Sequence, residues 1–592
     1  MCDKIPDSIL LQIFRFLENF VDLMSSSRVS AQWHRVSMDE FLWKRLFIND
    51  FRPNFSPSNL NFSWLEEYKR TKYEAPVKPA ESLNNGHSDE VLHVSFSRGG
   101  SIFASCSKDG YIKIWISEYP CKLKCERNLK DQFGWIYPQN SQFTDADDLL
   151  LVSGVKPNFS SLDPASGDIA IFRLEANDLS FCCRIPIRPY DFFGCWYDNA
   201  WFLSGEYEYI AEATSATTIF LCKSSQEVEK TTTCLLNGYI YRFLNLNASS
   251  VRMVAVGTYV SDWLRNTTAL INVATADAKE QKKGDFLCCI SGMGECSTYP
   301  PDKLLVFTCG SKTYTPHQIG FKIILGSLVA SKLDEEVMSD KRLELVKNRL
   351  KVMRENDQSL DDLLEQQSNL TPLQQFFQNI EHQADNLDEQ NDELNAVAPD
   401  QLNEDILRAF FNFPDHVMEF NGHITGLRLG PKHRELYVNV RSWPSRITDI
   451  SDPWRPPQIS EDIEIRVVEL ETLTLRHIVS YTGHKGYTIN SDCFFIFLDV
   501  SENYVASGSE DKNAYLWDRR FGHLIKKFKH EAVVNCVAFH PSSKNTEESS
   551  STDDNYFRDQ MMVTASDDKT LRIWRSKKAL DYFQSCESLR SS

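Results

Sequence analysis

One order of residues occurs three times in this chain, and it constrains the fold more than any other feature. Each copy starts with a histidine, passes through an alternating apolar segment and a segment of small residues, and reaches an aspartate in a predicted tight turn. A last strand-like segment then ends in a tryptophan six positions after that aspartate. The marking residues are His87, Asp109 and Trp115, then His484, Asp511 and Trp517, then His530, Asp568 and Trp574.

These recurring polar residues are interpreted as architectural. A histidine, a hydroxyl, an aspartate and a strand-end tryptophan can hydrogen-bond in sequence within one sheet, and they then satisfy polar groups that stacked sheets would bury. A catalytic triad would occur once, whereas this set recurs along the chain. The sequence also lacks a Gly-Lys phosphate loop, an HExxH motif and a GxSxG motif. We therefore predict a protein that is not an enzyme, without catalytic residues, metal site or cofactor.

The repeat resembles the WD40 repeat, which implies a mostly β chain folded as a β-propeller with four strands in each blade. Weaker copies lie between the clear ones. Gly422-His423 opens one of them, and the strand-like segments Gly167–Phe172 and Leu304–Thr308 lack the full polar set. Seven blades need about 300 residues at 40–45 residues each, and the repeat region is longer than that. We expect seven blades, with eight left open.

The first fifty residues have a different pattern, which predicts a small head of three short helices. Pro6 stands where the first turn of a helix tolerates proline, and apolar residues follow it at helical spacing. Three short helices are too small to bury so many large apolar side chains among themselves. We therefore expect some of these side chains to be covered by a neighbour.

The head resembles an F-box, and an F-box followed by a WD40 propeller resembles the substrate receptors of cullin–RING ubiquitin ligases. Longer stretches, above all Asn490–Arg519, resemble one subgroup of that family. The resemblance implies that the head binds the Skp adaptor of an SCF complex and that the propeller binds a target protein for ubiquitination and proteasomal degradation. The residues expected to contact the adaptor are Ile5, Pro6, Leu10, Ile13, Phe14, Leu17, Leu23, Val29, Trp33 and Trp43.

Two further hypotheses stay open. Trp517-Asp518-Arg519-Arg520 matches a W-D-x-R pattern that, in some WD40 proteins, contacts the damage-binding adaptor of a second class of cullin ligase. Trp517, Asp518 and Arg520 are the candidate residues for that contact, although Trp-Asp also closes many ordinary blades. The other hypothesis is a WD40 scaffold that does not lead to degradation, in which the helical head is only a structural cap.

The chain divides into an F-box at 3–50, a connector at 51–80, a propeller at 81–578 and a tail at 579–592. Two inserts interrupt the propeller. Residues 333–400 contain 17 acidic and 6 basic side chains, a net charge of −11, and predict a solvated, largely disordered insert. Residues 542–554 contain no apolar side chain and predict a polar loop.

Charge and cysteine content restrict the partners and the compartment. The net charge of −18 gives no field that attracts nucleic acid or an anionic membrane, so we predict neither as a partner. The apolar stretches are too short to cross a bilayer, and the N-terminus has no signal-peptide pattern. Sixteen cysteines are too few for a disulfide scaffold of this size. We expect a cytoplasmic protein with reduced cysteines, with a nuclear pool left open.

Overall fold

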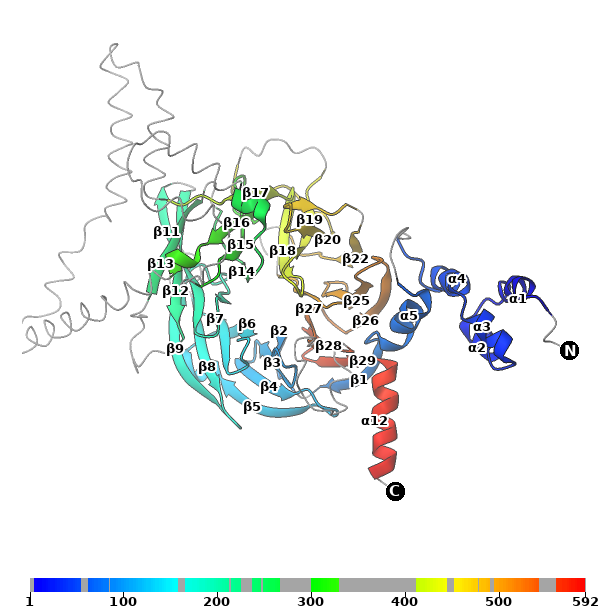
Figure 1. Cartoon of the computed structure of the whole chain (residues 1–592). Coiled ribbons are helices and arrows are strands. Elements are labelled where there is room, and N and C mark those ends of the chain that lie inside the picture. Colours follow the sequence, from blue (N-terminus) through cyan, green and yellow to red (C-terminus); the bar gives the residue numbers. More distant parts are fainter. Residues whose placement is uncertain are drawn as a thin grey trace, which may run out of the picture.

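The computed structural model describes residues 5–54, 62–84, 86–157, 166–211, 214–224, 237–245, 249–266, 300–329, 411–444, 452–477, 479–489, 495–541 and 560–590. These residues form a ring of seven antiparallel sheets with a helical head beside it (Figure 1). Each sheet is one blade of a β-propeller, so the predicted fold class and the expected seven blades are confirmed.

In six blades the strands follow one another along the chain, and the first strand lies nearest the central channel (Figure 1). Blade 1 contains β2 (Val91–Phe96), β3 (Ile102–Ser107), β4 (Tyr111–Ile116) and β5 (Lys122–Asn128). Blade 2 contains β6 (Tyr137–Phe143), β7 (Leu149–Val155), β8 (Gly167–Leu174) and β9 (Leu179–Ile187). Blade 3 contains β10 (Cys195–Trp196), β11 (Trp201–Ala211), β12 (Thr214–Lys223) and β13 (Asn237–Asn245).

The second half of the ring repeats this order. Blade 4 contains β14 (Val254–Gly257), β15 (Lys303–Cys309), β16 (Gln318–Ile324) and β17 (His416–Glu419). Blade 5 contains β18 (Gly422–Leu429), β19 (Glu435–Ser442) and β20 (Asp462–Glu469), and both β21 (Thr474–Leu475) and β22 (Tyr481–Lys485) pair with β20. Blade 6 contains β23 (Leu498–Val500), β24 (Tyr504–Ser507), β25 (Asn513–Asp518) and β26 (Leu524–Lys529).

Blade 7 joins the two ends of the ring. It contains β27 (Val534–Phe539), β28 (Met561–Ser566) and β29 (Leu571–Arg575), and its outer strand is β1 (Lys78–Leu83) from the other end of the propeller sequence. In the antiparallel register Leu83 lies opposite Leu571 and Lys78 opposite Arg575. The ring therefore begins at Lys78, three residues before the predicted boundary, because the end of the expected connector supplies this closing strand.

Aromatic side chains from distant blades meet in the centre of the ring. The ring centroid of Phe193, ahead of blade 3, lies 4.9 Å from that of Phe495 and 5.7 Å from that of Phe497, both ahead of blade 6. The Phe497 centroid also lies 4.9 Å from that of His93 in blade 1. Aromatic residues in or just ahead of three different blades thus contact one another in the centre of the ring.

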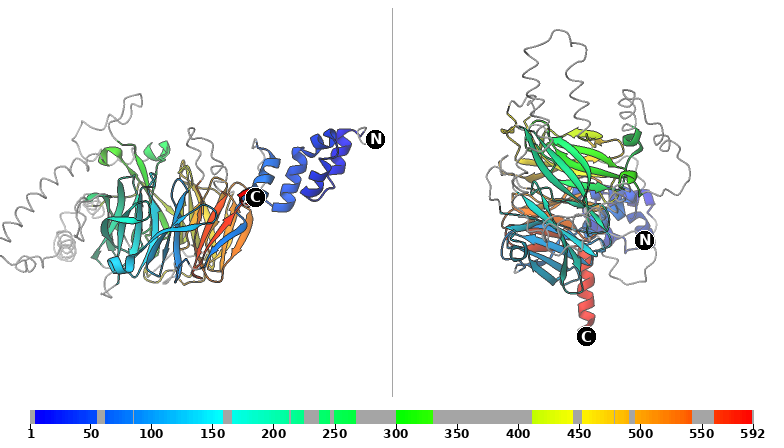
Figure 2. Two further views of the ribbon diagram at one scale, coloured as in Figure 1. Left: turned by 90° about the horizontal axis from the view of Figure 1, so that it is seen from below. Right: turned by 90° about the vertical axis from the view of Figure 1, so that its left-hand side faces the viewer.

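The helical head extends away from the rim of the ring (Figures 1 and 2). It contains α1 (Asp7–Phe14), α2 (Phe20–Ser26), α3 (Ala31–Ser37) and α4 (Glu40–Phe51), one helix more than expected. The middle segment forms two helices because Asn19 and Ser30 each cap a helix: their side chains accept hydrogen bonds from the backbone N–H groups of Asp22 and Trp33.

Short helices connect the head and the ring and follow the last strand. The predicted connector contains α5 (Trp64–Lys69) and one π-helical turn, η2 (Arg70–Glu74), before β1. A short helix, α6 (Leu129–Phe133), precedes blade 2, and the predicted tail is largely the helix α12 (Lys577–Arg590). The predicted insert at 333–400 and the loop at 542–554 lie outside the described residues. In the part of the chain that is described, no helix is long and apolar enough to span a membrane.

Candidate functional site

Two of the three predicted polar sets form as a hydrogen-bonded chain. In blade 1, Nδ1 of His87 lies 2.9 Å from Asp109 Oδ2, and Nε2 lies 2.8 Å from Ser105 Oγ. The Trp115 indole N–H donates to the same Ser105 oxygen over 2.9 Å. His87 and Ser105 are buried. With a proton on Nδ1 the imidazole donates to Asp109 and accepts from the Ser105 hydroxyl, so each of these atoms has a matching partner and the set satisfies buried polar groups, as predicted.

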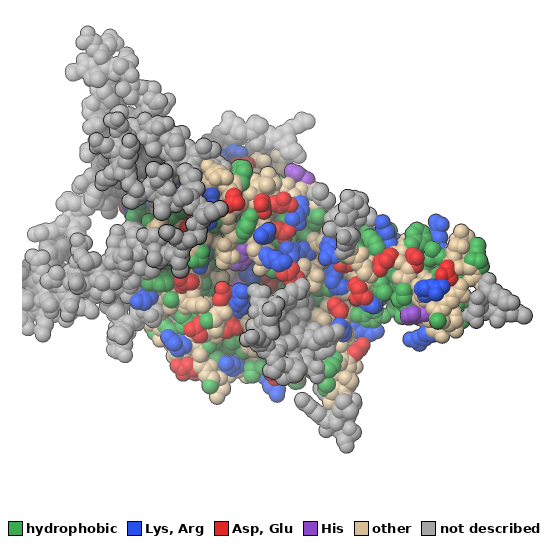
Figure 3. Space-filling view, viewed as in Figure 1, with side chains coloured by type: hydrophobic (Ala, Val, Ile, Leu, Met, Phe, Trp, Pro, Cys, Tyr) green, Lys and Arg blue, Asp and Glu red, His purple; other side chains and the backbone are tan. Residues whose placement is uncertain are grey.

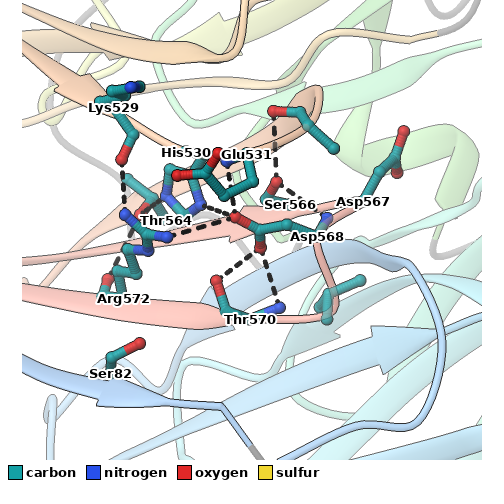
Figure 4. Close-up of polar contacts among 12 residues, drawn as sticks. Ser82, Lys529, His530, Glu531, Thr564, Ser566, Asp567, Asp568, Thr570 and Arg572 are labelled. Carbon is teal, nitrogen blue, oxygen red and sulfur yellow. Dashed lines mark hydrogen bonds and ion pairs between the residues drawn. The ribbon is translucent and has the colours of Figure 1, made fainter.

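The set in blade 7 has the same order, and Figure 4 shows its His530, Thr564 and Asp568. Nδ1 of His530 lies 2.9 Å from Asp568 Oδ2 and Nε2 lies 2.8 Å from Thr564 Oγ1, to which the Trp574 indole donates over 3.0 Å. Burial lowers the pKa of His530 although Asp568 opposes it, so the imidazole is neutral near pH 7. Burial would raise the pKa of Asp568, but hydrogen bonds from His530 and Thr570 outweigh it and lower that pKa.

The third predicted set, in blade 6, does not form. His484 is fully buried, which lowers its pKa to about 3, but its Nε2 lies 3.2 Å from Asn439 Oδ1 of blade 5 and not beside Asp511. The Tyr515 hydroxyl donates to Asp511 Oδ2 over 2.5 Å, and the Trp517 indole donates to a backbone carbonyl. The prediction is wrong here because Tyr515 takes the aspartate and Asn439 takes the histidine.

The helical head has its own apolar core, and part of the predicted adaptor site belongs to it. Trp43 is 2% exposed, and its indole N–H donates to the Ser37 carbonyl over 2.9 Å. The ten predicted residues divide into three groups by exposure. Leu10, Phe14, Leu23 and Trp43 are buried in this core, Ile5, Leu17 and Trp33 are half-buried, and Pro6, Ile13 and Val29 are exposed.

Large apolar side chains remain exposed on the outer surface of the head (Figure 3). Phe16, two residues after the end of α1, is 82% exposed, and Ile13 and Ile9 lie three and seven positions before it, four residues apart on one side of α1. An exposed apolar group of this kind marks a protein-binding surface. We call this group the apolar face of the head, and its members are Ile9, Ile13, Phe16, Val21, Val29 and Phe41.

Sequence reasoning missed Ile9, Phe16, Val21 and Phe41 as candidate contacts. The apolar residues of the first helix cover more than one side of it, and the predicted set joined residues from both sides. Leu10 and Phe14 point into the core of the head, where the Phe14 ring centroid lies 5.1 Å from that of Trp33. The signal that could have separated the two sides is the position of Ile9, Ile13 and Phe16 at spacings of four and three residues.

The W-D-x-R segment lies at the end of β25 and in the turn that follows it, where the ring contacts α5 and η2 of the linker. Asp518 is fully buried, and one of its carboxylate oxygens accepts a hydrogen bond from Arg70 of η2. The Arg520 guanidinium donates to Glu67 of α5. The segment is therefore engaged within the chain, at the point where the head joins the propeller.

Aromatic side chains surround this contact. Phe521 of the ring is fully buried among residues of the head and linker, and its ring centroid lies 4.9 Å from that of Phe47 and 5.8 Å from that of Trp64. The backbone N–H and side-chain amide of Asn54 donate to the carbonyls of Phe521 and Gly522 over 3.3 and 2.7 Å. The propeller thus covers some of the apolar side chains of the head, whereas those of the apolar face remain exposed.

Comparisons with known proteins agree with both parts of the chain. The family model described as F-box-like matches residues 2–49, and the model described as WD domain, G-beta repeat matches residues 78–115, 475–518 and 522–575. A shorter similarity joins the chain to a WD repeat-containing protein 26 homolog of Arabidopsis thaliana, 35% identical over 16% of this chain and 13% of that protein. The propeller matches include the three clearest repeats and the closing strand β1.

Mammalian proteins are similar to this chain over almost its whole length. F-box/WD repeat-containing protein 5 of Mus musculus and that of Homo sapiens are each 31% identical to it, over 98% of this chain and 95% of their own length. The helical head, the closing strand and the seven blades described above fit this match in order. The chain therefore belongs to the F-box/WD repeat-containing protein 5 family.

Proposed function

We propose that this chain is the substrate-recognition subunit of an SCF-type ubiquitin ligase. The head binds the Skp adaptor of a cullin–RING core, and the propeller binds a target protein for ubiquitination and degradation. The chain itself makes and breaks no bonds. It raises the effective concentration of target lysines at a separately recruited conjugating enzyme. Membership of the family supports the general role of ubiquitin ligase substrate receptor.

The apolar face of the head is the observation that carries the proposal. Six large apolar side chains, four of them 50% exposed or more, are unfavourable on a free surface, and burial of each by a partner would contribute about 1.5–3 kcal/mol at most. A head that served only as a cap would place these side chains against the ring. Instead α1 lies at the end of the head that is remote from the ring (Figure 1; Figure 2, left). The open face therefore supports adaptor binding over the scaffold hypothesis.

Binding of the purified Skp adaptor to the full chain tests the proposal. Phe16→Asp and Ile13→Asp place a charge on the apolar face, and each should weaken adaptor binding by roughly tenfold or more, since an apolar contact of this size is lost. Leu123→Asp is the matched control, because Leu123 is also an exposed apolar residue, 44% exposed on β5 of the propeller. Equal binding by all three variants and the unchanged chain would contradict the proposal.

The second ligase class remains a prediction from the W-D-x-R motif. Arg520 pairs with Glu67 in the described structure and its side chain is 43% exposed, so a damage-binding adaptor that bound its guanidinium would compete with Glu67 of α5. A cytoplasmic location with reduced cysteines likewise stays a prediction. The cysteines Cys106, Cys195 and Cys536 are buried and unbridged, and burial raises the pKa of each thiol, which makes these groups poor nucleophiles.

A further inference from the structure

We propose that the W-D-x-R segment serves the chain itself, as the receptor for the linker helix α5, and that it holds the apolar face of the head in one direction relative to the propeller. The direction matters for ubiquitin transfer only if the head binds the adaptor, so the purpose of this contact rests on the proposed function. The contact itself rests on the side chains described next, which we call the linker clamp: Glu67, Arg70, Asp518, Arg520 and Phe521.

The four charges in the linker clamp alternate in sign, and the inner two belong to the linker while the outer two belong to the ring. Arg520 of the ring contacts Glu67, and the Glu67 carboxylate in turn accepts from Arg70 Nε over 3.0 Å and from Arg70 Nη2 over 2.7 Å. Arg70 then contacts Asp518 of the ring. Glu67, Arg70 and Asp518 have side chains 9, 13 and 0% exposed, so three of the four charges are shielded from solvent. Each of the two linker charges is thus paired with an opposite charge of the ring.

The carboxylate of Asp518 has a second task in the same turn. Its Oδ1 accepts the backbone N–H groups of Arg520 over 2.9 Å and of Phe521 over 2.8 Å. This arrangement fixes the turn that presents Phe521 and the Gly522 carbonyl to the linker side. Burial would lower the pKa of Arg70, but Asp518 opposes this and the pKa is raised, so Arg70 stays charged. One aspartate therefore shapes the turn and receives the linker cation.

Phe521 shows that the docked arrangement is built into the ring. A phenylalanine on a rim turn would be exposed without the head, yet here it is fully buried, and it belongs to the apolar cluster of the head. Trp64 lies against it at an interplanar angle of 27°. The His523 ring centroid lies 5.8 Å from those of Phe47 and Phe51 of α4. These contacts reach both α4 and α5, so a pivot of the head about either helix would separate them.

A double variant in the linker, at Glu67 of α5 and Arg70 of η2, can test this proposal without changing the ring. Glu67→Gln together with Arg70→Gln removes both linker charges of the clamp. Glu66→Gln together with Lys69→Gln removes the neighbouring ion pair of the same helix, whose side chains are 67 and 50% exposed and 2.8 Å apart. Hydrogen exchange of the α5 and β25 backbone amides is measured in the full-length protein for the unchanged chain and both variants.

The clamp variant should exchange the α5 amides faster by roughly tenfold or more, while β25 amides and the solvent-facing control stay within about twofold of the unchanged chain. Unchanged α5 protection in the clamp variant would overturn the proposal. Equally faster exchange in β25 would also overturn it, because the loss would then lie in the blade. The clamp variant should still bind the Skp adaptor. If the unchanged chain fails to bind the adaptor, the proposed function fails while the exchange result stands.

Discussion

Replacement of Asp568 by asparagine should destabilise the propeller far more than the same replacement of Asp511. Both aspartates stand at the same position of the repeat, six residues before a strand-end tryptophan. Only Asp568 receives the histidine, at 2.9 Å, whereas Asp511 receives Tyr515. The pair therefore separates the effect of the polar chain from that of the residue type.

The expected magnitude follows from the partners of each carboxylate. Asp568 accepts from His530, from the backbone N–H groups of Glu531 and Thr570 at 3.0 Å each, and from the Thr570 hydroxyl. An asparagine has one acceptor oxygen and no charge, so the imidazole N–H loses a charged partner in a buried site. That loss costs on the order of 2–4 kcal/mol. In Asp511→Asn the main loss is the charged acceptor of the Tyr515 hydroxyl, and this should lower the free energy of unfolding by about 1 kcal/mol.

Urea denaturation of the full chain, followed by circular dichroism, measures both effects. The Asp568→Asn variant should have the clearly lower midpoint, and Asp511→Asn should remain close to the unchanged chain. Asp109→Asn, in the blade 1 set with His87, is the positive control and should resemble Asp568→Asn. Equal midpoints for Asp511→Asn and Asp568→Asn would refute the reasoning, because the histidine contact would then contribute nothing.

Three further outcomes are expected. Burial would raise the pKa of Glu435, but Arg519 lowers this pKa to about 2. The stabilisation by the Glu435 carboxylate is therefore fully present above about pH 4.5 and is lost as the pH falls toward 2. The free energies of unfolding of Glu435→Gln and the unchanged chain should converge over that pH interval. Gly508→Ala should cost about 1–3 kcal/mol by chemical denaturation, because the new Cβ would lie 2.1 Å from the Val534 carbonyl oxygen. Phe497→Ala should lower the thermal midpoint, since it removes a central ring at a cost of about 3 kcal/mol.

The spacing of residues along the chain was sufficient to predict the polar sets of blades 1 and 7 and the fold class. In blades 1 and 7 the hydroxyl and the tryptophan lie on neighbouring strands, and the histidine and the aspartate lie in the loops next to them, so their spacing along the chain determines their contact. Blade 6 differs through Asn439, whose amide donates to Ser507 Oγ over 3.0 Å from the neighbouring blade. A contact between blades leaves no periodic signal in the sequence, and this one takes the hydroxyl of the predicted set. His484 lies on β22, which pairs with β20 of blade 5, and it contacts Asn439 of that same blade.

In the head, too, the sequence pattern alone did not determine which residues contact one another. Helical periodicity identified which residues are apolar, but it did not distinguish Leu10, which faces the core, from Ile9, which faces outward. That distinction depends on how α1 packs against α3, which is a tertiary property. The internal use of Asp518 and Arg520 was also beyond local reasoning, because their partners Arg70 and Glu67 lie about 450 positions earlier in the chain.

The closing strand β1 has a consequence for how the two parts of the molecule can be separated. Because β1 is the outer strand of blade 7, the ring borrows its last edge from the polypeptide that leads out of the head. A fragment that starts at Val91 would present the bare edge of β29, and unpaired edges recruit other chains. A proteolytic cut between α5 and Lys78 would leave the pairing of β1 with β29 intact. The shortest fragment that keeps all four strands of blade 7 therefore starts at Lys78. A force that pulls on the head would act on the pairing of β1 with β29 once the contacts of the linker were broken.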